Sequence, residues 1–106
     1  MEIGPEELIE KLRRKDPVFL LDVRHDWERQ LVHLDDQAHV PLQELPARLE
    51  EVRPPAGALV VCYCHHGIRS LSAAALLRQA GMENAVSLAG GIDRWSSVVD
   101  PSLPRY

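Results

Sequence analysis

The chain has 106 residues, 45% of them hydrophobic and 26% charged, which suits one soluble domain, residues 1–106, with a hydrophobic core of its own. Lys and Arg total 12 against 16 Asp and Glu, and the resulting net charge of -4 excludes nucleic acid as an expected partner, because phosphate backbones attract basic surfaces. No apolar run approaches the roughly 20 residues that span a bilayer, and the acidic N-terminus lacks a signal-peptide core, so we expect no membrane partner and a cytoplasmic location.

The first half of the chain predicts helices around one buried strand. The strand is a continuous apolar run, which is typical of a strand covered on both faces. In chain order we expect a helix that begins near Pro5, this strand over 18–21, a short helix over 26–31, an extended piece over 39–42 and a helix over 43–52.

The second half predicts two more strands, each followed by a helix. We expect a loop over 54–57, a strand over 58–63, a helix over 68–80, a strand over 85–88 and a helix over 93–98. Strands that alternate with helices at short spacing indicate a parallel sheet covered on both faces. The predicted fold class is α/β.

The segment that carries chemistry is the loop from Cys64 to Arg69, which joins the strand over 58–63 to the next helix. Ligands of open α/β sheets bind at the carboxyl ends of strands. Backbone N–H groups of such a loop form a cradle of donors, and Gly67 allows the bend. The helix N-terminus and the Arg69 guanidinium favour a Cys64 thiolate, a nucleophile toward sulfane sulfur.

The loop residues resemble a known family. Cys-His-His-Gly-Ile-Arg-Ser, residues 64–70, is similar to the active-site loop of rhodanese domains. Asp-Val-Arg at 22–24 and Leu-Ala-Gly-Gly with Trp at 88–95 are similar to further landmarks of that family, in the same order. The resemblance implies a rhodanese-like open parallel sheet of about five short strands with helices on both faces.

The resemblance also implies a function: a sulfurtransferase of the thiosulfate:cyanide type, acting through a persulfide on Cys64. It implies a small-molecule sulfur donor, thiosulfate or a persulfide, and a thiol or sulfur-carrier protein as acceptor. Nothing in the sequence suggests an obligate dimer, so we expect a monomer, and we expect no cofactor or metal. Arg69 is expected to bind an anionic donor. The expected substrate-binding set is Arg69, His65, His66, Gly67, Ile68 and Ser70. For the two histidines, contact with substrate and simple exposure to solvent both remain open.

Three other functions fit parts of the pattern. Rhodanese-like phosphatases and arsenate reductases also pair Cys with Arg, but with five residues between them, whereas residues 65–68 give four here. A metal site would need Cys62, Cys64, His65 and His66, completed by His25, His33 or His39, yet adjacent ligands wrap poorly around one tetrahedral ion. A non-catalytic binding module typically lacks the cysteine that this chain keeps.

Several residues have structural interpretations. Cys62 follows the strand alternation and is expected in the core, and a disulfide between it and Cys64 would be strained. Asp22 is expected to accept N–H bonds where its strand ends, and Arg24 to pair with an acid such as Glu28. The glycine pair at 90–91 is expected to form a tight turn.

Overall fold

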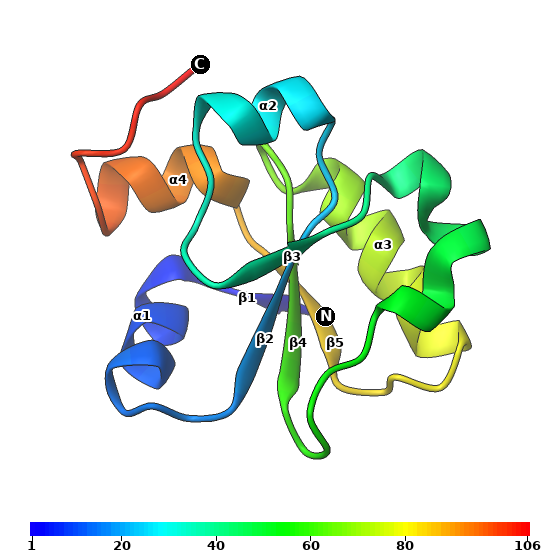
Figure 1. Ribbon diagram of the computed structural model, residues 1–106. Helices are drawn as coiled ribbons and strands as arrows, with labels where there is room; N and C mark the ends of the chain where they lie inside the picture. The colour runs from blue at the N-terminus through cyan, green and yellow to red at the C-terminus, as the bar shows by residue number, and fades with distance from the viewer.

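All five strands run parallel in one sheet, and the structure, a computed structural model, describes residues 1–106 (Figure 1). The strands are β1 (Glu2–Ile3), β2 (Val18–Asp22), β3 (Gln37–His39), β4 (Leu59–Tyr63) and β5 (Ala85–Leu88). Their spatial order is β1-β5-β4-β2-β3, so β4 lies at the centre. Every connection is a crossover, which places the loop after β4 at the carboxyl edge of the sheet.

Helices cover both faces of this sheet. Helices α1 (Pro5–Arg13) and α4 (Gly91–Val98) lie on one face, while α3 (Ile68–Gln79) and the 3-10 segment η1 (Leu42–Glu51) lie on the other (Figure 1). The short helix α2 (Asp26–Leu31) lies at the carboxyl edge, above the ends of the strands (Figure 1). The α/β class, the parallel sheet and its two helical layers are therefore confirmed.

Strand β4 explains why the sequence shows a continuous apolar run rather than an alternating one. Val60 and Cys62 pack into the core cluster beneath α3 and η1, whereas Val61 and Tyr63 pack into the cluster beneath α1 and α4. Successive side chains point to opposite faces, and here both faces are covered. Burial raises the pKa of the Cys62 thiol to about 12, which fits its structural interpretation.

Two predicted elements differ in detail from the structure. Residues 42–51 form 3-10 helix rather than the expected α-helix, with non-helical dihedrals at Arg48. Pro46 lies inside this segment and supplies no N–H, which favours short 3-10 turns over a continuous α-helix. The extended piece lies at Gln37–His39 rather than 39–42, and Pro41 already caps the following segment.

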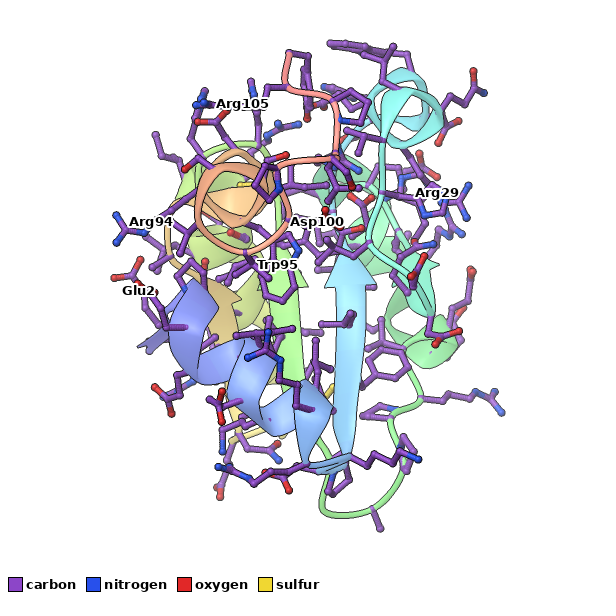
Figure 2. All side chains as sticks on the ribbon, turned by 90° about the vertical axis from the view of Figure 1, so that its left-hand side faces the viewer. Glu2, Arg29, Arg94, Trp95, Asp100 and Arg105 are labelled. Carbon is purple, nitrogen blue, oxygen red and sulfur yellow. The ribbon has the colours of Figure 1, made fainter.

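The chain ends at the edge of the candidate site. Trp95 anchors α4 against α1 and the sheet (Figure 2). The segment after α4 then turns back across the carboxyl edge toward α2 (Figures 1 and 2). Ser96 Oγ donates to the Leu103 carbonyl at 2.9 Å and fastens this return. None of the helices has the length and apolar character required to cross a bilayer.

Candidate active site

The sequence places Cys64 at the first position after the central strand. The bend that follows is short, because α3 begins at Ile68, as predicted, and Arg69 lies in its first turn. Gly67 makes the bend with a φ of 98°, a left-handed conformation that disfavours side chains. A Cβ there would also stand 3.1 Å from the Gly90 backbone nitrogen. Glycine at this position therefore meets both a conformational and a packing requirement.

The Cys64 sulfur is surrounded by hydrogen-bond donors. The backbone N–H groups of Gly67 and Ser70 donate to Sγ at 3.1 and 3.3 Å, and the Ser70 hydroxyl lies 3.3 Å from it. These groups are more favourable to a thiolate than to a thiol, because hydrogen bonds to an ionised acceptor are the stronger ones. The side chain is nevertheless almost enclosed, with 1% of the residue exposed. A reaction partner reaches this sulfur only when a neighbouring side chain moves.

A second hydroxyl continues the chain of hydrogen bonds away from the sulfur. Ser87, on β5, lies 2.7 Å from the Ser70 hydroxyl, and both serines are fully buried. When Ser70 donates to an anionic sulfur, Ser87 can donate to Ser70 in turn, which satisfies both hydroxyl groups. Sequence reasoning did not identify Ser87, since it stands on a different strand with no motif around it.

We expect Ser70→Ala to slow alkylation of Cys64 by iodoacetamide at pH 7 about tenfold, the factor that corresponds to losing one charge-assisted hydrogen bond. The backbone N–H of residue 70 remains, so the effect isolates the hydroxyl. Ser96→Ala is the matched control, because Ser96 is equally buried but bonds only the Leu103 carbonyl. If both variants react at the wild-type rate, the Ser70 hydroxyl does not stabilise the thiolate.

Arg69 does not stand free beside the thiol. Its two terminal nitrogens donate to the two carboxylate oxygens of Glu28 at 2.7 and 2.8 Å. The expectation that Glu28 pairs with Arg24 was therefore wrong. Glu28 is buried, and burial alone would raise the pKa of its carboxyl. Hydrogen bonds from Arg69, the Tyr106 hydroxyl and the His25 backbone outweigh that effect and lower the pKa to about 2.

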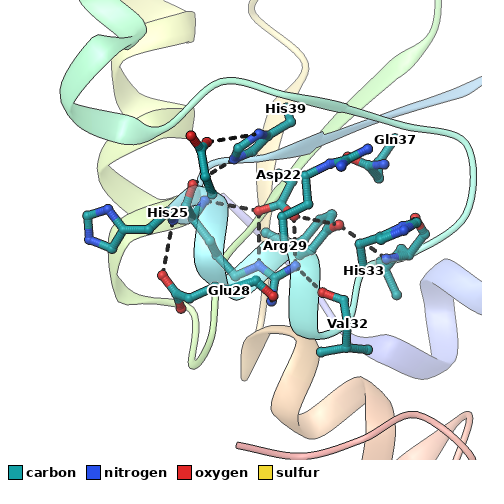
Figure 3. Close-up of polar contacts among 12 residues, drawn as sticks. Asp22, His25, Glu28, Arg29, Val32, His33, Gln37 and His39 are labelled. Carbon is teal, nitrogen blue, oxygen red and sulfur yellow. Dashed lines mark hydrogen bonds and ion pairs between the residues drawn. The ribbon is translucent and has the colours of Figure 1, made fainter.

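Arg24 pairs instead with Asp22, two residues before it. Figure 3 labels Asp22 together with Glu28 and Val32, two further residues that Arg24 contacts. Both side chains are fully buried, and Asp22 also accepts the Arg24 backbone N–H at 2.9 Å, as expected for a residue that ends a strand. The Tyr63 hydroxyl donates to the same carboxylate at 3.0 Å. Arg24 further donates to the carbonyl oxygens of Glu28 and Val32. This network fixes α2, and with it Glu28, against the end of β2.

Aromatic rings cover the loop. His65 is stacked between His66 and Tyr106, with ring centroids 3.8 Å apart in each pair. The Tyr106 hydroxyl also donates to Glu28 at 2.7 Å and accepts from Arg24 at 2.9 Å. Burial, followed by the neighbouring His66, lowers the pKa of His65 and favours its neutral form. Tyr106, 42 positions after the cysteine, was not identified from the sequence.

The remaining loop residues face outward. Ile68 is 77% exposed, and the His66 side chain is 60% exposed. His65, His66 and Asp93 are the only three side chains of ligand type that approach one another closely enough to share a metal ion. This group contains neither cysteine, and the Asp93 carboxylate is already bound by Arg105 at 2.9 and 3.0 Å.

The glycine pair after β5 holds the loop from the other side. The N–H groups of Ile92 and Asp93, in the first turn of α4, donate to the carbonyl oxygens of Cys64 and His65 at 2.9 and 3.1 Å. A Cβ on Gly91 would lie 2.5 Å from the Cys64 carbonyl oxygen. Gly91 thus permits close contact between two backbones, a role beyond the tight turn expected from the sequence.

A comparison with known proteins finds a family model that matches most of the chain. A family model described as Rhodanese-like domain matches residues 4–98. A protein of Allochromatium vinosum named Sulfurtransferase is 35% identical over 95 residues, a match that covers 90% of this chain and 87% of that protein. The probable adenylyltransferase/sulfurtransferase MoeZ of Mycobacterium tuberculosis is 33% identical over 104 residues. That match covers 98% of this chain but 26% of MoeZ, so the chain spans about a quarter of that relative.

Solved structures give the same result for the fold. A rhodanese-like domain protein from Staphylococcus aureus superposes with a TM-score of 0.81 at 27% identity, covering 99% of this chain and 97% of that one. A rhodanese-related protein from Thermoplasma volcanium has a TM-score of 0.79 at 26% identity, with 97% and 94% coverage. Both matches extend over nearly the whole of each chain, so the five-stranded sheet and its helices are shared throughout.

Proposed function

The chain belongs to the rhodanese-like domain family, and on that premise we propose that it transfers sulfane sulfur through a persulfide on Cys64. The similarity to a named sulfurtransferase supports sulfurtransferase activity in general. The observation that carries the finer proposal is the set of donors on one sulfur atom: two backbone N–H groups at 3.1 and 3.3 Å and the Ser70 hydroxyl at 3.3 Å. A sulfur held in this way is stabilised as a nucleophilic thiolate.

In the first step the thiolate attacks the outer sulfur of a donor. With thiosulfate, the new bond joins Sγ to that sulfur, the sulfur–sulfur bond of thiosulfate breaks, and sulfite leaves with the electron pair. With a hydropersulfide, the leaving group is the donor's thiolate. Either donor leaves Cys64 as a persulfide, a covalent intermediate that divides the transfer into two steps.

In the second step an acceptor attacks the outer sulfur of this persulfide, and Cys64 leaves as the thiolate. Cyanide takes the sulfur as thiocyanate, and a thiol, free or on a sulfur-carrier protein, takes it as a persulfide. The proposed substrate-binding residues are Arg69, His65, His66, Gly67, Ile68 and Ser70, of which the exposed His66 and Ile68 lie on the outer side of the loop. Because Cys64 is 1% exposed, the proposal requires the side chains over the loop to move when a donor enters.

Phosphoryl transfer fits the geometry less well. Phosphatases with a related loop place five residues between the cysteine and the arginine, whereas residues 65–68 give four here, so the loop encloses a smaller bowl. A sulfur atom needs less space and less positive charge than a phosphoryl group.

The sulfurtransferase proposal also includes a cytoplasmic, monomeric protein with no metal or cofactor.

Mass spectrometry of the intact protein tests the proposal. We expect incubation with excess thiosulfate, or with the hydropersulfide of 2-mercaptoethanol, to add one sulfur atom, about 32 Da. Cyanide should remove that mass and release thiocyanate in equal amount. A protein that gains no sulfur from either donor, while turning over a phosphate ester, would contradict the proposed reaction.

A further inference from the structure

We propose that Glu28 is a specificity-determining residue that, by holding both terminal nitrogens of Arg69, disfavours dianionic sulfur donors and selects donors of low charge such as hydropersulfides. Glu28 acts through Arg69 and is a positioning residue. The inference deepens the proposed sulfur transfer and rests on it for the identity of the reaction. Its central observation, an ion pair beside the reactive sulfur, is independent of that reaction.

The pair is firmly held. Glu28 is 2% exposed and lies in the first turn of α2, where its carboxylate accepts the His25 backbone N–H at 3.1 Å. The Tyr106 hydroxyl occupies one of the two oxygens that bind Arg69. A carboxylate with four donors and almost no contact with water exchanges partners reluctantly. An incoming anion must therefore compete for Arg69 with a partner already in place.

The cationic side chains of this network are already neutralised by acidic partners. Arg24 is neutralised by Asp22, and Arg69 is neutralised by Glu28. His65 is held neutral by burial, and Tyr106 is un-ionised because burial raises its pKa to about 12. Once Cys64 ionises, the group as a whole is negative by one charge. A doubly charged donor is repelled by that excess at short range more strongly than a hydropersulfide, which carries at most one negative charge.

The test compares an inert dianion with two donors. Sulfate resembles thiosulfate in shape and charge and transfers nothing, so its protection of Cys64 against iodoacetamide, at constant ionic strength, reports anion binding alone. In Glu28→Gln the carboxylate no longer neutralises Arg69. We expect sulfate to protect at a concentration about tenfold lower than in the wild type, the factor for one charge-assisted contact.

The same variant is then measured for sulfur transfer. Its kcat/KM for thiosulfate should rise about tenfold, while kcat/KM for the hydropersulfide of 2-mercaptoethanol stays within about threefold. Glu44→Gln is the matched control, because Glu44 pairs with Arg48 at 2.8 Å on the exposed surface of η1. That variant should leave both the sulfate protection and the ratio of the two donors unchanged.

The outcomes separate the two proposals. If no donor sulfurates Cys64 but sulfate protection improves in Glu28→Gln, the sulfur transfer is wrong and the masking of Arg69 stands. If both donors change by one factor, or if neither the ratio nor the protection changes in the folded variant, the selective role of Glu28 is overturned. Should Glu28→Gln fail to fold, Glu28→Asp draws the carboxylate back by one methylene, so that it no longer reaches both terminal nitrogens of Arg69, and the donor ratio should shift toward thiosulfate. A donor ratio unchanged in that variant overturns the role equally.

Discussion

Replacing Cys64 with serine is expected to reduce sulfur transfer at least about a thousandfold while leaving the fold intact, because the reaction passes through a covalent intermediate on the cysteine sulfur. The serine hydroxyl still accepts the Gly67 and Ser70 N–H bonds that now end on Sγ. It is not ionised at neutral pH and cannot carry a persulfide. The measurement is thiocyanate release from thiosulfate and cyanide, together with the mass gain in the absence of cyanide.

Cys62→Ser is the control, since Cys62 is the only other cysteine and lies in β4, two residues before Cys64. It is fully buried in the cluster beneath α3, so a hydroxyl there costs about 1–3 kcal/mol of stability. We expect this variant to unfold more easily and yet to gain one sulfur. Retention of transfer by Cys64→Ser, or its loss from Cys62→Ser in folded protein, would place the reactive sulfur on the other cysteine.

The sequence predicts the framework because long apolar runs admit few alternatives. Residues 18–21 and 58–63 are too apolar and too short for surface helices, and both form central strands. The two-residue strand β1 carries no such signal, and it exists only because β5 offers Glu2 and Ile3 a parallel edge. The segment η1 shows a second limit of prediction from sequence. The apolar spacing locates a helix there, but Pro46 changes the hydrogen-bonding pattern of that helix to the 3-10 type.

Some contacts of the candidate site could be predicted from the sequence, and others could not. Cys64, Gly67 and Ser70 all lie within residues 64–70, and a strand-to-helix bend brings their polar groups together without reference to distant residues. Glu28 and Arg69 are separated by 41 positions, so only the tertiary structure pairs them. The Arg24–Glu28 expectation failed for a local reason. A separation of four residues pairs side chains only on a continuous helix, and α2 begins after Arg24.

A methyl group added at Gly91 is expected to disrupt the reactive loop from outside it. Gly91 has a φ of 62°, and its Cβ would meet the carbonyl groups of Cys64 and His65, which belong to the backbone and cannot rotate away. Relief of this overlap requires α4 to move back and to release the two hydrogen bonds that hold those carbonyls. We expect Gly91→Ala to cost about 3 kcal/mol or more in the free energy of unfolding, measured by urea denaturation.

Gly57→Ala separates this overlap from the strain of a positive φ. Gly57 has a φ of 80°, yet its Cβ would meet no atom within 4 Å. Alanine there should cost about 1 kcal/mol, the price of the left-handed conformation alone, and leave sulfur transfer unchanged. Gly91→Ala should lose transfer even in urea-free buffer, because the displaced carbonyls carry Cys64 and its donors with them. Equal losses of stability in the two variants, with transfer intact in both, would show that the approach of α4 does not hold the loop.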